Sequence, residues 1–344
     1  MLPLKSITDE LDRKIQSCLS GRKQTHFWYA SFAGANANHI GQLYEMGFDN
    51  YPLAPVEDPH RILFFEKLFG CDICVKDKSA PSFFNTWPVP KIRCRSDLVC
   101  LKPDLNDNVV CQEYLNAVSC YLDFTTGENQ LPVAARAFYP LDLACNLCGA
   151  ENLFAWMLEA EEDVLQFFDR MADLYLAVRE RLLGFGARLV NALGFPCVTC
   201  SDLQLPCLSA DMIRRFVLPC YEKVARACGG AFIGLDCCDI GLLEEVMGFD
   251  WLVGCSFDRR LPLAEIRRTI GKKIFVLPYY AYDDGFDRPT LKDGIYWNPI
   301  VQCHSRNAED VYREMAQQCN MVIIIERPGL QDVVAVRKRM LAGS

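Results

Sequence analysis

Three short apolar segments of this 344-residue chain each end in a cluster of Cys, Asp and Ser side chains. Residues 197–202 read Cys-Val-Thr-Cys-Ser-Asp, residues 234–239 read Gly-Leu-Asp-Cys-Cys-Asp, and residues 252–258 read Leu-Val-Gly-Cys-Ser-Phe-Asp. Thiolates and carboxylates bind metals, and carboxylates also transfer protons. Such clusters can build one catalytic or metal-binding centre if the fold brings them to the same place.

Helical segments follow these clusters, and strands that alternate with helices at this spacing indicate βαβ units and a parallel sheet. The clearest helix is predicted over 161–183, where apolar residues recur at three- and four-residue steps. Another is predicted over 209–228, with Ser209 as its N-cap. In a parallel barrel the C-terminal strand ends converge on the face that carries the chemistry. The clusters should therefore point at a common centre.

The remaining strand signals fit the same architecture. A strand is predicted over 131–138, and the continuous apolar runs 273–277 and 321–325 are typical of strands buried on both faces. Residues 71–112, rich in Pro, Asp and Ser, form an elaborated region before most of the strands. We therefore expect an α/β fold, a (β/α)8 TIM-type barrel with an elaborated N-terminal region, in a single domain over residues 1–344.

The composition narrows the classes of molecule that this protein is expected to bind and the compartment in which it is expected to work. The 36 Lys and Arg residues against 44 Asp and Glu give a net charge of −8 without any basic block, so nucleic acid is not expected as a partner. No apolar run approaches the roughly 20 residues of a membrane helix, and the N-terminus has no signal-peptide core. Nineteen cysteines, an odd number, without an export signal predict reduced thiols. We expect a cytoplasmic protein of anaerobic or strongly reducing metabolism.

Several segments carry a family pattern. Residues 140–144 read Pro-Leu-Asp-Leu-Ala and precede Cys148-Gly149, while 208–221 hold a Ser, then a Phe, then Pro-Cys-Tyr. Gly229-Gly230 leads into the Asp-Cys-Cys-Asp cluster, and Gly-Phe-Asp at 248–250 precedes the next strand. In this order the segments resemble the uroporphyrinogen decarboxylase superfamily. The resemblance covers about residues 5–335, is strongest over 130–260, and implies the barrel.

The superfamily contains two chemistries, and the first needs no metal or cofactor. Authentic uroporphyrinogen decarboxylases hold the carboxylates of a porphyrinogen with an arginine-rich N-terminal loop and an aspartate. The corresponding segment here, residues 27–34, reads Phe-Trp-Tyr-Ala-Ser-Phe-Ala-Gly and has no arginine. Because a polyanionic substrate needs fixed cations, this absence argues against an octa-acid substrate.

The second chemistry is that of corrinoid-linked methyltransferases, in which zinc bound by a His-x-Cys pair and a later Cys activates a thiol or an ether oxygen. The position of that pair is occupied here by Leu-Asp-Cys-Cys at 235–238. Either Asp236 replaces the histidine and Cys238 is the thiolate ligand, or Cys237 is the cysteine ligand and the histidine is lost. The later cysteine is also absent, but Glu326 stands at the end of the last strand and can supply a carboxylate ligand.

Other residues are candidates for catalysis or cofactor contact. Asp202 and Asp236 end strands and can stabilise positive charge, and His304 follows a long loop over 278–298. His39 follows the first strand, and Trp297, in the Tyr-rich loop, can anchor a substrate or a corrinoid partner. Each residue also has an ordinary structural interpretation: a capped turn, packed cysteines, surface histidines, an ion pair between Glu326 and its neighbour Arg327, or a self-packed loop.

These observations favour a methyltransferase that acts with a corrinoid protein, and so with its cobamide, on a small methylated substrate or on a thiol or folate acceptor, assisted by zinc. One alternative is a cofactor-free decarboxylase in which Asp202 or Asp236 stabilises a protonated, electron-rich ring. The other is a non-catalytic barrel that binds a corrinoid or a tetrapyrrole. The first hypothesis alone requires a metal.

Overall fold

The computed structural model describes residues 3–21, 24–32, 39–57, 60, 63–75, 86–100, 103–125, 130–235, 239–257, 263–271, 273–279, 312–313, 315–317, 319–327 and 329–342. Its centre is a six-stranded parallel sheet in the order β1-β10-β9-β8-β7-β6. The strands are β1 (His26–Phe32), β6 (Val198–Ser201), β7 (Ala231–Leu235), β8 (Leu252–Phe257), β9 (Ile274–Tyr279) and β10 (Asn320–Arg327). The predicted runs 273–277 and 321–325 are thus strands.

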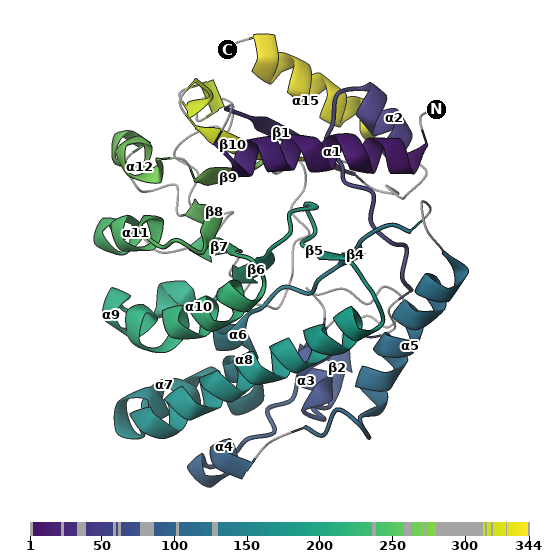
Figure 1. Cartoon of the computed structure of the whole chain (residues 1–344). Coiled ribbons are helices and arrows are strands. Elements are labelled where there is room, and N and C mark those ends of the chain that lie inside the picture. The colour runs from purple at the N-terminus through teal and green to yellow at the C-terminus, as the bar shows by residue number, and fades with distance from the viewer. Residues whose placement is uncertain are drawn as a thin grey trace.

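Helices follow the strands and cover the outside of the sheet, as Figure 1 shows for α10 to α12 and α15. These helices are α10 (Leu218–Ala227), α11 (Ile240–Met247), α12 (Leu263–Ile270) and α15 (Leu330–Ala342). The long α8 (Glu161–Gly184) confirms the helix predicted over 161–183. Before it lie α1 (Leu4–Leu19), α2 (Ile40–Glu45), α3 (Phe64–Leu68), α4 (Arg95–Cys100), α5 (Val109–Phe124), α6 (Pro140–Cys148) and α7 (Ala150–Glu159), with a small hairpin of β2 (Ile73–Val75) and β3 (Thr86–Pro88).

The two faces of the sheet pack into separate apolar clusters. Phe27, Phe232 and Val322 pack with the apolar face of α1, which crosses in front of β1 and β10 in Figure 1. The neighbouring residues of the same strands, such as Trp28 and Ile233, pack in the larger cluster with the outer helices. This separation follows from the alternation of side chains along a strand.

The helix predicted over 209–228 is interrupted. It consists of α9 (Ala210–Met212), a π-helical turn (η5, Ile213–Val217) and α10. Pro219 has no N–H to donate to the fourth residue before it, and Leu218 N–H instead reaches Ile213 O, five residues back. Ser209 is the N-cap, as predicted, and accepts a hydrogen bond from Met212 N–H at 3.2 Å.

The sheet is not closed among the described residues, so the expected (β/α)8 barrel is only partly visible. The strand predicted over 131–138 is reduced to β4 (Val133–Ala134), paired with β5 (Leu189–Val190), and a single bridge from Phe138 to Cys200 in β6. Between β1 and β4 the side chain of Asn50 exchanges two hydrogen bonds with the backbone of Ala30, and Ala54 N–H donates to Pro132 O. Two prolines, at 52 and 55, have no N–H to donate, so this segment cannot form a continuous ladder.

The close packing of β8 gives a first testable expectation. A Cβ atom on Gly254 would lie 2.6 Å from Phe232 Cε1 and 2.7 Å from the backbone oxygen of Ile274. We therefore expect Gly254→Ala to lower the free energy of unfolding by about 1–3 kcal/mol, because neighbouring strands must separate. Gly184→Ala, where nothing lies within 4 Å, is the matched control and should change little. Urea unfolding of both variants measures the difference, and equal stabilities would contradict this packing.

None of the helices among these described segments combines the length and the apolar character needed to cross a bilayer.

Candidate functional site

The C-terminal edge of the sheet gathers small polar side chains. The register places Ser201 of β6 beside Gly234 of β7, and Gly234 beside Ser256 of β8. Gly234 and Ser201 are so close that a Cβ atom on the glycine would lie 2.5 Å from Ser201 Oγ. These three positions lie in neighbouring strands, close to the carboxyl end of each strand.

The Asp-Cys-Cys cluster follows this row directly. β7 ends at Leu235, so Asp236 is the first residue after the strand. Asp236, Cys237 and Cys238 themselves lie outside the described residues. The strand end next to them is nevertheless defined, and it lies on the edge of the sheet where parallel α/β enzymes carry their active sites.

Glu326 lies at the same edge of the sheet. It is the penultimate residue of β10 and pairs with Ser31 of β1 in the parallel register. Strands β9 and β8 separate β10 from β7, which is three steps of about 4.8 Å, or about 14 Å along the sheet. A metal shared between Glu326 and the 236–238 segment therefore requires the sheet to curve and bring the two strand ends together.

Asp202, a predicted catalytic residue, is fully buried just beyond β6. Its Oδ1 accepts a hydrogen bond from Asp142 N–H at 2.7 Å, and its Oδ2 accepts one from the Tyr221 hydroxyl at 2.6 Å. Burial raises the pKa of Asp202 well above its usual range, and the charge of Asp142 adds to this, while the two hydrogen bonds oppose it. In this conformation Asp202 joins α6 to α10, and its catalytic role stays a prediction.

Asp142 makes the reciprocal contact. Its carboxylate oxygens accept hydrogen bonds from Leu203 N–H at 2.8 Å and Gln204 N–H at 3.0 Å, in the turn that follows Asp202. Each aspartate thus satisfies the backbone of the segment that carries the other, which is how buried N–H groups avoid being unpaired. Asp142 and Tyr221 lie in the family-like segments of the sequence, but no role was predicted for either. Their joint presence with Asp202 was the available signal.

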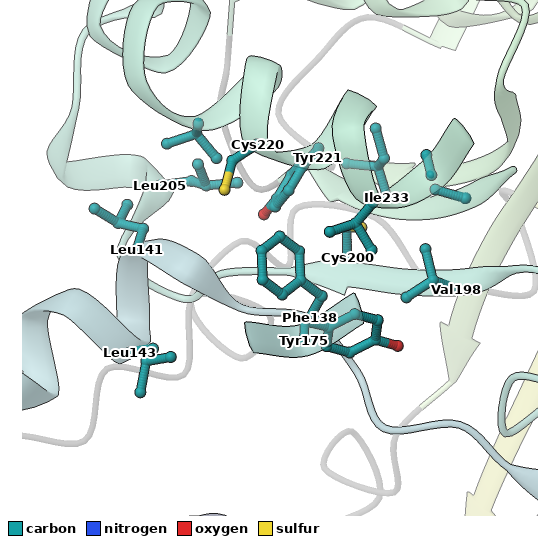
Figure 2. Packing of buried hydrophobic residues seen from close by; sticks show 14 of the residues in the cluster. Phe138, Leu141, Leu143, Tyr175, Val198, Cys200, Leu205, Cys220, Tyr221 and Ile233 are labelled. Atoms are coloured by element: carbon teal, nitrogen blue, oxygen red, sulfur yellow. The ribbon is translucent and has the colours of Figure 1, made fainter. Parts of the chain in front are cut away.

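Aromatic rings lie beside this contact between Asp142 and Asp202, on the side of the helices. Figure 2 shows Phe138 between Tyr221 of α10 and Tyr175 of α8, with ring centroids 6.4 Å and 5.1 Å away, respectively. Cys200 and Cys220 lie in the same cluster. Burial raises the pKa of the thiols of Cys200 and Cys220 well above the usual value. Both side chains are buried, so in this structure they pack against their neighbours.

The Cys-x-x-Cys pair at 197 and 200 does not chelate. Cys197 packs in the cluster that contains α1, and Cys200 packs in the outer cluster, so the two sulfurs lie on opposite faces of the sheet. Within the described part of the chain, no group of three or more His, Cys, Asp and Glu side chains is placed to hold a metal. Residues 236–238 lie outside that part.

The structure describes His26, His39 and His60, but not His304 or the predicted Tyr-rich loop. His39 is half-buried and occupies the N-cap position of α2. Burial lowers the pKa of His26, and His60 is paired with Glu113 at 2.5 Å. His304 and Trp297, with the loop from 280 to 298, lie outside the described residues.

A second buried acid was missed by the sequence analysis. Glu66 of α3 is fully buried and accepts hydrogen bonds from Asn146 Nδ2 at 2.7 Å and from the Tyr139 hydroxyl at 3.2 Å. Burial raises the pKa of Glu66, against these hydrogen bonds. The signal in the sequence was a carboxylate within the apolar run Leu-Phe-Phe-Glu-Lys-Leu-Phe, where a charge is costly without partners.

Comparison with known families matches this architecture. The family model described as uroporphyrinogen decarboxylase (URO-D) matches residues 45–277, and the chain belongs to this family. A methylated-thiol–coenzyme M methyltransferase of Methanosarcina mazei is 25% identical over 150 residues, which are 44% of this chain and 39% of that protein. The chain therefore matches about two fifths of the length of this relative.

A solved structure shares the fold. A methyltransferase from Methanosarcina mazei superposes with a TM-score of 0.58 at 11% identity, over 96% of this chain and 98% of its own. At this identity the likeness concerns the fold alone. Both similar proteins are methyltransferases, which is consistent with the methyltransferase branch of the superfamily and confirms the resemblance read from the sequence.

Proposed function

We propose that this chain transfers a methyl group between a small substrate and a corrinoid protein that carries a cobamide. The donor is a small methylated compound, or the acceptor is a thiol or a folate. The observation that carries the proposal is the position of the Asp-Cys-Cys cluster immediately after β7, at the carboxyl edge of the sheet. Similarity to a methylated-thiol–coenzyme M methyltransferase also supports methyl transfer as the reaction.

The proposed metal is zinc, with ligands drawn from Asp236, Cys237, Cys238 and Glu326. The position of these residues supports such a site: three directly follow one strand, and Glu326 is the penultimate residue of another at the same edge. Their thiolate and carboxylate groups are those that zinc accepts. When bound, zinc supplies a Lewis acid that keeps a thiolate available near neutral pH or polarises the atom that carries the methyl group.

The rest of the chain has supporting roles in this proposal. The open edges of the sheet are joined into a (β/α)8 barrel through the 49–54 segment, so that β10 and β7 face each other across the mouth. The Tyr-rich loop with Trp297, together with His304 and His39, contacts the substrate or the corrinoid partner. Asp202 holds the first turn of α6 against the end of β6, and this fixes one wall of the mouth.

A substrate assay tests the proposed function. Purified, anaerobically prepared protein is mixed with methylcobalamin and a simple thiol, and loss of the methylcobalamin absorbance is followed. We expect turnover above the uncatalysed rate, and no conversion of uroporphyrinogen to coproporphyrinogen by the same preparation. Porphyrinogen decarboxylation without any demethylation would show that the chain belongs with the cofactor-free enzymes.

A further inference from the structure

A pocket of about 610 Å³ lies between α8 and the segment that precedes α5. One face of α8, from Phe167 to Arg181, forms its floor, and residues 103–105 form the facing wall. None of these described lining residues belongs to a strand, so the pocket is separate from the strand ends that carry the proposed reaction. Its volume falls within the roughly 300–1,000 Å³ of pockets that bind small molecules.

The inside of this pocket is apolar. Its inner side chains are at most 8% exposed, and they are Phe69, Leu105, Phe167, Met171 and Leu174. The exposed lining positions, at 104, 173 and 177, mark the side that opens to solvent. An apolar molecule that enters the pocket loses its contact with water and gains contact with these side chains, which favours binding.

Hydrogen bonds from two helices hold the facing wall in place. Arg181 of α8 donates from Nη1 to Leu105 O at 2.8 Å and from Nη2 to Asn106 Oδ1 at 2.7 Å. From α5, Gln112 Nε2 donates to Leu105 O at 3.2 Å and to Asn106 O at 3.1 Å. The wall is therefore preorganised, so ordering it costs little free energy when a ligand binds.

The charged side chains around the pocket balance one another and have partners within the protein. Two arginines and two aspartates line it. Beside Arg181, Arg170 Nη2 donates to a backbone oxygen of α4 at 2.6 Å. Asp173 pairs with Lys223 Nζ at 2.7 Å, and Asp104 Oδ1 accepts a backbone hydrogen bond at 2.8 Å. The lining thus offers no excess charge that would offset the lost hydration of a charged ligand.

We propose that this pocket is a second binding site, which takes an uncharged and largely apolar small molecule. The ligand packs against the apolar face of α8 between Phe167 and Leu174 and against Leu105 of the facing wall. The site goes beyond the proposed function and does not depend on it, because the pocket shares no residue with the proposed metal and substrate sites.

Fluorescence titration of the full chain tests this pocket with two probes that share one skeleton. N-phenyl-1-naphthylamine is uncharged, and 8-anilino-1-naphthalenesulfonate adds a sulfonate to the same rings. We expect the uncharged probe to bind about tenfold more tightly, because the sulfonate loses hydration without gaining a countercharge. Ala177→Trp, at the exposed rim, should weaken the uncharged probe about tenfold by filling the pocket. Ala155→Trp, at an exposed position of α7 outside the pocket, is the matched control and should bind like the wild type.

A second measurement locates the bound probe. Met171 lies in the floor of the pocket, and its signal in protein labelled at the methionine methyl groups is assigned by comparison with Met171→Leu. We expect the uncharged probe to shift this signal over the same concentrations at which the fluorescence saturates. An unmoved Met171 signal, equal or tighter binding of the sulfonate, or wild-type affinity in a folded Ala177→Trp protein would overturn the assignment. If Ala177→Trp does not fold, the Met171 signal and the comparison of the two probes decide.

Discussion

Replacing the cysteine ligand that follows β7 should remove most of the zinc. Protein prepared without oxygen is expected to hold close to one zinc ion per chain, and Cys238→Ala or Cys237→Ala should lower this sharply. Closed zinc sites bind with about 10–16 kcal/mol, so one of four ligands carries roughly 3 kcal/mol, or about a 100-fold loss of affinity. Metal analysis after gel filtration measures the occupancy, and methyl transfer should fall with it.

The control for this experiment is a cysteine far from the strand ends. Cys120 is exposed on α5, and Cys120→Ala should keep both zinc and activity. The pair of variants also resolves the two arrangements left open by the sequence, since only the true ligand should release the metal. Full zinc occupancy in both Cys237→Ala and Cys238→Ala would remove this cluster from the metal site.

The second large effect is expected at Asp202. Asp202→Ala leaves the Tyr221 hydroxyl and the Asp142 N–H buried without their acceptor. Each unpaired group costs about 1–3 kcal/mol, so we expect a loss of about 2–6 kcal/mol in the free energy of unfolding. Asp202→Asn keeps the shape and one acceptor and should cost less. Urea unfolding at pH 7 measures both variants.

The same residue should make stability depend on pH in a defined direction. An aspartate in the unfolded chain has a pKa of about 3.9, and burial raises that of Asp202 in the folded chain. The protonated folded form is therefore favoured at low pH. Its contribution to the free energy of unfolding is lost as the pH rises through the pKa of Asp202 in the folded chain. The wild type should lose stability relative to Asp202→Asn between pH 4 and pH 7, while Asp123→Asn, an exposed control, should follow the wild type. A relative gain by the wild type over that range would contradict the raised pKa.

The periodic elements could be predicted from the sequence because each has a strong local signal. The apolar stripe of α8 and the continuous runs of β9 and β10 were correctly assigned. The strand expected over 131–138 was largely wrong, because only two of its residues form a ladder. Its partners are β5, more than 50 residues later, and Cys200 of β6, while Ala54 N–H donates to Pro132 O on the other side. Such long-range pairings leave no local pattern in the sequence.

The candidate site, like the fold, could be predicted only in part from the sequence. Position at the end of a strand could be predicted for Asp202 and for Glu326, and the structure places both at strand ends. Burial could not be predicted, because it depends on how α6 and α10 close over Asp202.

The central claim is that a zinc ion bound after β7 is required for methyl transfer. Zinc titrated into chelator-stripped protein, with the rate of methylcobalamin demethylation by a thiol followed at each addition, tests it most directly. We predict no activity in the stripped protein, a linear rise to one equivalent of zinc, and a plateau thereafter. Full activity in the stripped protein, or no response to added zinc in a protein that has kept its fold, would contradict this account.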